Sequence, residues 1–319
     1  MAQPALAACP GTSTCKPNDG CPQGSVIITP GHSIQNAINA AGCAATICVK
    51  PGTYTGLIDF KGKKINLVSS NGPAVTILNG GALGPVVSFK TAEGPASILD
   101  GFQVVNGKSP TGGGIFIQNA SPIIRNCTIS RNVAAATSTN NLDVGTTMFL
   151  NNQATGDGGG IHAGVVYGNV LVRQCWFKGN KAGGSGGGMW IPAGLAQVIN
   201  NTFDGNQASV GGGIAAGFGG MVDVASNIFA NNTGTALVNT QPVGSNTSVV
   251  NHYNDFFNNT GGTFVDTYGD LDPLFVDPQL NACCPVSTSP VIDAGIPDSL
   301  FNDPNGTRND MGACGGPVI

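Results

Sequence analysis

A glycine-rich motif that returns along the chain at regular distances limits the folds that this sequence can adopt. Three consecutive glycines and an apolar residue occur at residues 112–115, 158–161, 186–189 and 211–214, in steps of 46, 28 and 25 residues. The first step has room for two units of the shorter period. Self-similarity with a period of about 20–50 residues is typical of a solenoid, in which each unit buries its apolar face only against its neighbours.

A second motif, Phe-x-x-Asn, runs beside the glycines. Its phenylalanines are Phe149, Phe177, Phe203 and Phe229, in steps of 28, 26 and 26 residues, and alternating strands such as residues 170–173 precede them. So short a strand is not stable alone, whereas stacked coils pair every strand and bury one continuous core. Glycine and asparagine suit the bends because both tolerate a positive φ. The repeats therefore predict an all-β fold, a parallel β-helix.

Aligning the coils on the phenylalanines defines a column of residues two positions earlier, which should share the inward direction of the phenylalanines. Stacked asparagines in this column could form hydrogen-bonded ladders. Two cysteines of the column lie two coils apart, about 9.6 Å at about 4.8 Å per coil, beyond the roughly 7 Å Cα separation of a disulfide. We therefore predict that these two are free and buried. The column contains Cys127, Thr147, Cys175, Asn201 and Asn227.

The two ends differ from the repeats. Residues 33–42 read as a short amphipathic helix that Ser33 caps and Gly42 ends, suited to cover the exposed edge of the first coil. Five of the 10 cysteines fall in the first 48 residues and three near the C-terminus, so we expect disulfide-rich ends, with the short Cys43–Cys48 loop as one bridge. We divide the chain into a Cys-rich segment (1–30), the β-helix (31–265) and C-terminal capping loops (266–319).

Composition points to an exported protein and away from two kinds of partner. Charged residues make up 9% of the chain and the net charge is −4, so the basic footprint of a nucleic-acid-binding protein is missing. No apolar stretch reaches the 18 or so residues of a transmembrane segment. The Ala5-Leu6-Ala7 step resembles the end of a signal peptide, and the cysteine content favours an oxidising compartment. We expect a secreted, extracellular or cell-surface location.

Several segments resemble known proteins. Residues 33–35 (Ser-Ile-Gln), 51–54 (Pro-Gly-Thr-Tyr) and 100–107 are similar to the first coils of pectate-lyase-like right-handed β-helix proteins, and residues 272–278 and 289–295 are similar to their final segment. The Gly-Gly-x-Ile and Phe-x-x-Asn repeats resemble those of polymorphic outer-membrane proteins, which are surface adhesins. The resemblance implies a right-handed helix but selects no activity, because the fold carries lyases, epimerases, hydrolases and non-enzymatic surface proteins.

One outward column is the candidate site. The residue after each glycine motif should point out of the coil, which places Phe116, His162 and Trp190 on one face, with His162 and Trp190 on adjacent coils. Exposed aromatic rings in a groove suit the apolar faces of sugar rings. Near them, Asp157 and Lys181 could join His162 in proton transfer. We therefore predict His162, Asp157 and Lys181 as catalytic residues and Phe116 and Trp190 as substrate-binding residues.

Two further groups complete the candidate site. Arg173 lies two coils from Arg125 in one column, and an arginine could grip an acidic sugar. Hard cations such as calcium need several oxygen ligands, and two groups of aspartates could supply them or simply shape turns. The first group is Asp266, Asp270, Asp272 and Asp277, and the second is Asp303 with Asp310.

Two functions fit these observations, and the sequence leaves both open. The first is a secreted protein that binds an extracellular polysaccharide or cell-surface glycan along its groove and could cleave it as a polysaccharide lyase does. The second is a non-catalytic cell-surface or extracellular structural protein or adhesin. The scarcity of lysine and arginine favours the second, and the aromatic column favours the first.

Overall fold

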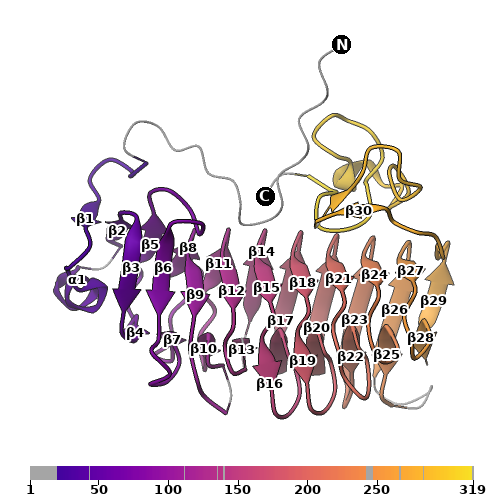
Figure 1. Cartoon of the computed structure of the whole chain (residues 1–319), viewed down its shortest axis with the longest axis horizontal. Coiled ribbons are helices and arrows are strands. Elements are labelled where there is room, and N and C mark those ends of the chain that lie inside the picture. The colour runs from indigo at the N-terminus through magenta and orange to yellow at the C-terminus, as the bar shows by residue number, and fades with distance from the viewer. Residues whose placement is uncertain are drawn as a thin grey trace.

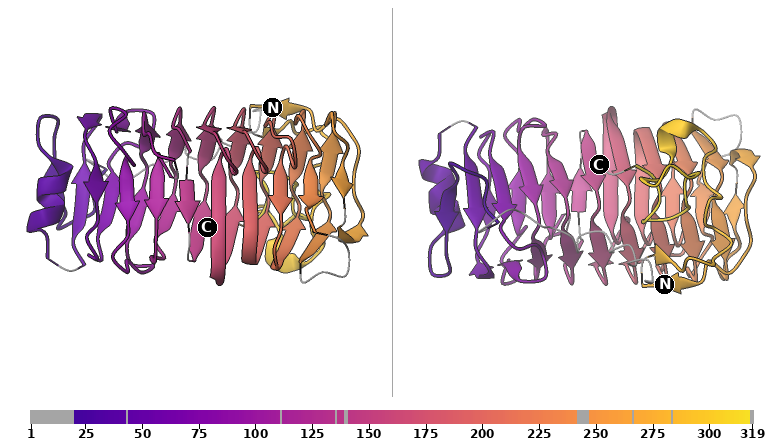
Figure 2. Two further views of the ribbon diagram at one scale, coloured as in Figure 1. Left: turned by 90° about the horizontal axis from the view of Figure 1, so that it is seen from below. Right: turned by 90° about the horizontal axis from the view of Figure 1, so that it is seen from above.

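The computed structural model shows a right-handed parallel β-helix, as predicted. It describes residues 20–317 except residues 43, 111, 135, 139–140, 242–246, 266 and 283. Each coil contributes short strands to three faces, and the coils stack along one axis (Figures 1 and 2). Every pairing between coils is parallel; in the described part of the chain the one antiparallel pair is the C-terminal hairpin of β30 (Leu280–Asn281) and β31 (Cys284–Pro285).

Two of the faces belong to one 18-stranded sheet, whose two ladders meet only in β17 (Ile161–Arg173) and β20 (Met189–Ile199). We call the ladder with the glycine-motif strands the column face. It contains β4 (Ile58–Asp59), β7 (Val87–Phe89), β10 (Ile115–Ile117), β13 (Ala136–Ser138), the first parts of β17 and β20, β22 (Ile214–Ala216), β25 (Leu237–Asn239) and β28 (Phe264–Val265).

We call the second ladder of that sheet the groove face. It contains β1 (Val26–Ile28), β2 (Thr46–Val49), β5 (Asn66–Ser69), β8 (Ile98–Asp100), β11 (Ile123–Arg125), β14 (Leu142–Gly145), the later parts of β17 and β20, β23 (Gly220–Ala225), β26 (Ser248–His252) and β29 (Tyr268–Leu271).

The third face is a separate nine-stranded sheet, which we call the cap face because the C-terminal loops cover part of it. It contains β3 (Gly52–Thr55), β6 (Thr76–Asn79), β9 (Gln103–Val105), β12 (Thr128–Ser130), β15 (Met148–Leu150), β18 (Trp176–Lys178), β21 (Thr202–Asp204), β24 (Ile228–Ala230) and β27 (Asp255–Phe257). Beyond it, β16 (Gln153–Ala154) and β19 (Lys181–Ala182) form a short pair.

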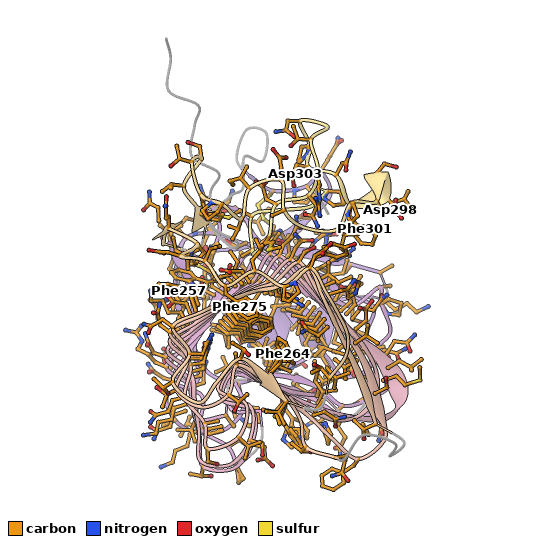
Figure 3. The ribbon with its side chains drawn as sticks, turned by 90° about the vertical axis from the view of Figure 1, so that its right-hand side faces the viewer. Phe257, Phe264, Phe275, Asp298, Phe301 and Asp303 are labelled. Atoms are coloured by element: carbon orange, nitrogen blue, oxygen red, sulfur yellow. A yellow bond between two sulfur atoms is a disulfide. The ribbon has the colours of Figure 1, made fainter. Side chains whose placement is uncertain are left out.

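The repeated phenylalanines stack through the core. Their ring centroids lie 4.6–5.1 Å apart with interplanar angles of 3–7°, from Phe149 through Phe177, Phe203 and Phe229 to Phe256. Viewed along the axis, the stacked side chains fill the centre of the coils, and Phe264 and Phe275 lie at its C-terminal end (Figure 3). Such offset ring pairs add to the free energy of apolar burial.

The third glycine of the motif explains why the two repeats occur together. A Cβ atom on Gly188 would lie 2.7 Å from the ring of Phe203, and one on Gly213 would lie 2.6 Å from the ring of Phe229. Real Cβ atoms do not approach other atoms so closely, so the bend must be bare where the stacked ring lies beneath it. Phe177, Phe203 and Phe229 each lie against such a glycine, namely Gly160, Gly188 and Gly213.

Asparagine side chains join successive coils in two buried ladders. In the ladder that follows the cap-face strands, Asn180 donates from its backbone N and its Nδ2 to Asn206 Oδ1, at 3.1 and 3.0 Å. Asn206 Nδ2 in turn donates to Phe177 O and Asn232 Oδ1, at 2.8 and 3.1 Å. The second ladder runs through Asn201, Asn227 and Asn254, two of which the sequence had placed in the inward column.

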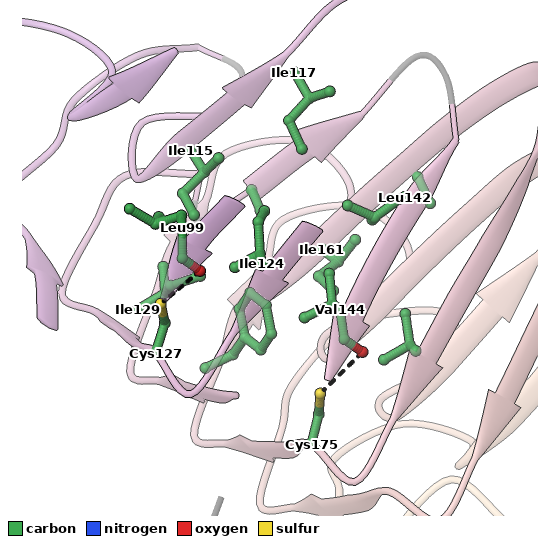
Figure 4. Close-up of a cluster of buried hydrophobic side chains, with 14 of the residues drawn as sticks. Leu99, Ile115, Ile117, Ile124, Cys127, Ile129, Leu142, Val144, Ile161 and Cys175 are labelled. Carbon is green, nitrogen blue, oxygen red and sulfur yellow. Dashed lines mark hydrogen bonds between the residues drawn. The ribbon is translucent and has the colours of Figure 1, made fainter. Parts of the chain in front are cut away.

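The two cysteines of that column are free and buried, which confirms the prediction for Cys127 and Cys175. Their Sγ atoms lie near Leu99 O and Val144 O, at 3.8 and 3.7 Å (Figure 4). Burial raises the pKa of each thiol to about 12, so both stay protonated at neutral pH.

Disulfides lie near both ends, as expected, but one proposed pairing is wrong. Cys48 bonds to Cys21, not to Cys43, and Cys284 bonds to Cys314. Cys48 lies in β2, and the bond ties it to the segment that precedes β1. Sequence proximity alone did not reveal this partner, because the intervening helix returns the chain to the first coil.

Helix α1 (Ile34–Ala40) covers the N-terminal end of the stack, with Ser33 as its N-cap (Figure 1). Ile34 and Ile38 join the core. The helix ends at Ala40, with Ala41 rather than Gly42 as its C-cap, and the ammonium of Lys63 donates to the carbonyls of Ile38 and Ala41, both at 2.8 Å.

The chain after β29 folds back along the side of the helix, over the cap face (Figure 1). It includes the hairpin and a 3₁₀ turn, η1 (Ser299–Phe301). Asn200 Nδ2 donates to Asn309 Oδ1 at 2.7 Å, and Gly312 N donates to Ser226 O at 2.7 Å. We call residues 272–317 the C-terminal loops.

Replacing Asn206 with alanine should strongly destabilise the protein. The change removes the acceptor of two buried donors of Asn180, and each buried polar group left unpaired costs about 1–3 kcal/mol. We expect the free energy of unfolding to fall by about 2–4 kcal/mol in chemical denaturation. The control Asn169→Ala, at an exposed position, should change it by less than about 0.5 kcal/mol. Equal effects of the two changes would contradict the role of the ladder.

Candidate functional site

The predicted outward column exists and runs along the column face. Phe116, Thr137, His162, Trp190 and Ala215 are successive register partners across β10, β13, β17, β20 and β22. The residue before each of the motif positions points into the core. His162 and Trp190 are therefore neighbours on adjacent coils, and the half-buried Phe116 lies two strands from His162.

Trp190 is not the exposed platform that the sequence suggested. Its strand neighbours Met189 and Ile191 point into the core, so Trp190 points out of the coil. Even so, only 5% of Trp190 is accessible to solvent. The loop between β22 and β23 covers the indole. The Phe218 ring meets the indole edge-on, with the ring centroids 6.2 Å apart. A Cβ atom on Gly217 would lie 3.0 Å from the indole, so the glycine leaves room for the ring. Phe218, at 70% exposure, is the aromatic residue that faces solvent there.

The three predicted catalytic side chains are not joined to one another by any hydrogen bond or ion pair in the described part of the chain. His162 is half-buried, and burial lowers the pKa of its imidazole while the charge of Asp157 raises it. Asp157 Oδ1 accepts a hydrogen bond from Ser185 N at 2.6 Å, which links two glycine bends. Lys181 is exposed and lies in β19. Their catalytic roles remain predictions.

Arg173 lies away from the His162 column. It ends β17 on the groove face, and its Nη2 is 3.8 Å from Asp143 Oδ1. Gly145 is the register partner of both Arg173 and Arg125, so the two arginines share one column, as predicted. A ligand on the His162 column would lie on the other ladder of the sheet, and the sequence could not show that one long strand serves both faces.

An open groove of about 440 Å³, which no sequence motif indicated, lies on the groove face. Leu195, Met221 and Val250, on adjacent strands, are 52%, 59% and 38% exposed and line it. Gln197 and Asp223 supply polar groups between them. Exposed apolar side chains that adjoin one another on a soluble protein commonly mark an interaction surface.

A histidine–aspartate pair lies beside this groove. His252 Nε2 is 2.6 Å from Asp223 Oδ1, and both side chains are partly exposed, at 21% and 39%. The Asp223 carboxylate fixes the orientation of the His252 imidazole. Aligning the coils could have indicated this pair. His252 is the register partner of Ala225, two residues after Asp223 on the neighbouring strand, so Asp223 and His252 point in the same outward direction.

The aspartates considered for calcium separate into two groups. Of the first, the side chains of Asp266 and Asp270 lie outside the described residues, and Asp277 Oδ1 accepts from Gln279 N within a turn. The second pair, Asp303 and Asp310, is compact, and Asp293 joins it: one carboxylate oxygen from each of the three lies within 4.8 Å of the others. Burial raises the pKa of Asp303 to about 6 and also raises that of Asp310.

One buried carboxyl lies between the β-helix and the C-terminal loops. Asp255 Oδ1 accepts from Val276 N at 3.0 Å, whereas Oδ2 is buried and has no hydrogen-bond partner among the described residues. Burial raises the pKa of this carboxyl to about 7, and the charge of Asp277 adds to the rise.

Comparison with known proteins gives one partial similarity. Over 150 residues the chain is 32% identical to the probable outer membrane protein PmpG of Chlamydia muridarum (strain MoPn / Nigg). The match spans 43% of this chain and 14% of that protein. It agrees with the likeness of the repeats to polymorphic outer-membrane proteins, whereas the pectate-lyase-like features remain a prediction. No protein-family profile matches the chain. None of the helices in the described residues has the length and apolar character needed to cross a membrane.

Replacing Trp190 with alanine should destabilise the protein, because the indole is covered although it points out of the coil. Removing a buried aromatic side chain typically costs about 3–5 kcal/mol. We expect a loss of roughly 2–4 kcal/mol here, since the loop with Phe218 can partly close the space. Chemical denaturation measures it. A loss below about 0.5 kcal/mol would show that Trp190 is exposed in solution.

The protein should be more stable near pH 5 than near pH 8 through Asp255 and Asp303. Their folded pKa values, about 7 and about 6, exceed the ordinary value of 3.8, so the folded state binds more protons between about pH 4 and 7. Stability therefore falls as pH rises through this range. Asp255→Asn should raise the free energy of unfolding at pH 8 by about 1–3 kcal/mol, since one pKa unit corresponds to about 1.4 kcal/mol. Melting curves across pH measure this, and an unchanged pH profile in the variant would contradict the assignment.

Proposed function

We propose that this chain is a non-catalytic cell-surface β-helix whose groove face is adhesive. The observation that carries the proposal is the open groove, where Leu195, Met221 and Val250 are exposed on three adjacent strands. Isolated exposed apolar residues are common on soluble proteins, but adjoining ones favour a partner. The partial similarity to a probable outer membrane protein supports a surface location, and the resemblance to surface adhesins supports the role.

The construction of the helix suits such a role. The stacked rings and the asparagine ladders tie successive coils together, so the strands that line the groove are held in fixed positions. A partner then binds without the loss of conformational freedom that a flexible surface would undergo. The predicted catalytic residues, in contrast, are not held together: Asp157 bonds to a bend and Lys181 is exposed.

Polysaccharide binding is the second candidate. It is favoured by the adjacency of His162 and Trp190 and by the half-buried Phe116 in the same column. In this proposal an extracellular polysaccharide or cell-surface glycan lies along the column face, and His162, Asp157 and Lys181 would serve a lyase-type cleavage. The covered indole of Trp190 weakens it, because the ring offers no free face to a sugar.

Calcium stays a proposal as well, with Asp293, Asp303 and Asp310 as its ligands. The convergence of three carboxylates among the C-terminal loops is the geometry that supports it. A hard cation with oxygen ligands would offset the repulsion among them and bind more weakly as pH falls.

The adhesive proposal predicts that Leu195→Ser/Met221→Ser weakens binding without unfolding the protein. Burying a large aliphatic side chain on binding is worth about 1.5–3 kcal/mol, so losing two should lower affinity at least roughly tenfold. The measurement is binding of fluorescent protein to an array of immobilised extracellular-matrix proteins and glycans. The melting temperature should stay nearly unchanged, because both side chains are more than half exposed.

A matched control is Leu83→Ser, which changes a 75% exposed leucine outside the groove and should bind as wild type. Undiminished binding of the double variant would remove the groove from the proposal. A separate assay tests for lyase activity. The wild-type protein is incubated with a panel of polysaccharides, and ultraviolet absorbance reports any unsaturated products. Product formation that His162→Ala abolishes would establish the lyase and overturn the non-catalytic proposal.

A further inference from the structure

A cleft of about 280 Å³ lies between the cap face and the C-terminal loops. The cap face contributes Lys178, Asp204, Asn231 and Phe257, and the C-terminal loops contribute Asp277 and Leu280. Small-molecule sites commonly lie where two structural layers meet and combine apolar walls with a few fixed polar groups. This cleft has both, and it lies on a different face from the adhesive groove and from the His162 column.

The polar groups of the cleft are held in place by a connected network. Asp204 Oδ2 accepts from Lys178 Nζ at 2.8 Å, and Oδ1 accepts from Asn231 Nδ2 at 3.1 Å. Asn231 Oδ1 accepts from Asn258 Nδ2 at 2.9 Å. The Asp204 side chain is only 12% exposed, so its carboxylate is fixed in position at the edge of the cleft. A bound ligand would meet donors and acceptors that need no rearrangement.

An aromatic ring completes the cleft at the end opposite Lys178. Lys178, Asp204, Ala230 and Phe257 are successive register partners on β18, β21, β24 and β27, so they form one outward column. Asp204 and Phe257 are two strands apart, roughly 9.6 Å at about 4.8 Å per strand. The small Ala230 lies between them. Phe257 lies on the outside of the coil, below the C-terminal loops (Figure 3).

We propose that this cleft binds one neutral hexose ring, free or as the terminal residue of a glycan. A hexose has hydroxyls that can donate to Asp204, accept from Lys178 and exchange hydrogen bonds with Asn231, and it has an apolar face that can cover the Phe257 ring. An anionic ligand fits poorly, because Asp204 and Asp277 outnumber the single ammonium of Lys178. A purely apolar ligand would displace water from the cleft and leave the polar groups of the network without the hydrogen bonds that water supplies. The site does not depend on the adhesive role of the groove.

Isothermal titration calorimetry with glucose, galactose and mannose tests the proposal, with glucuronate as the charged comparison. At least one neutral hexose should bind with a Kd in the millimolar range, more tightly than glucuronate. Phe257→Ala and Asp204→Asn should each weaken binding at least tenfold. The control Leu83→Ala, which shortens a 75% exposed side chain outside the cleft, should bind as wild type.

Fluorescence gives a second measurement that depends on the site. Lys178 Nζ lies 4.9 Å from the centre of the Trp176 ring, and the chain has 2 tryptophans, so Trp176 is the remaining reporter in Trp190→Phe. Hexose should change its emission with the same Kd. No binding of any neutral hexose, tighter binding of glucuronate, or undiminished binding by a folded Phe257→Ala would each overturn the proposal. If Asp204→Asn fails to fold, Phe257→Ala alone decides it.

Discussion

Hydrogen bonds from one asparagine amide to the next coil are the interaction on which the rest of this structure depends. Each coil must turn its backbone between faces, and the turns place polar groups in a dry interior where an unpaired group is costly. One side chain such as Asn206 provides an acceptor for the preceding coil and donors for the backbone and the following coil. The same solution repeats from coil to coil, which explains how a chain with 9% charged residues buries so many polar groups.

The ladders also determine what else can occupy the core. The parallel strand pairing that they accompany spaces the coils by about 4.8 Å, so rings in successive coils come to lie 4.6–5.1 Å apart, the distance of stacked aromatics. The stacked rings then require bare bends such as Gly188. Where the inward column changes from asparagine to Cys175, that residue still donates its backbone N to Asn201 Oδ1, at 2.9 Å, so the ladder begins without a gap. The glycine, phenylalanine and asparagine repeats are thus parts of one arrangement.

This dependence decides what could be predicted from the sequence. The fold, the inward column and the free state of Cys127 and Cys175 follow from a period, and a period is visible in one sequence. The cover over Trp190 comes from Phe218, in a loop that breaks the period, and the bond between Cys21 and Cys48 ties a strand to a segment that precedes the first coil. The Asp223–His252 pair and the cap cleft depend on which outward residues meet across strands and loops, and periodicity does not report that.

The C-terminal loops illustrate a consequence for the evolution of such a chain. They attach to several coils at once, through Asn200, Thr202 and Ser226, although they follow the last strand of the stack. A duplication or loss of one whole coil ahead of these coils would preserve every ladder and every attachment, whereas an insertion of half a coil would break both. Related chains should therefore differ in length by steps of about one coil, and the attached coils should be the ones that they retain.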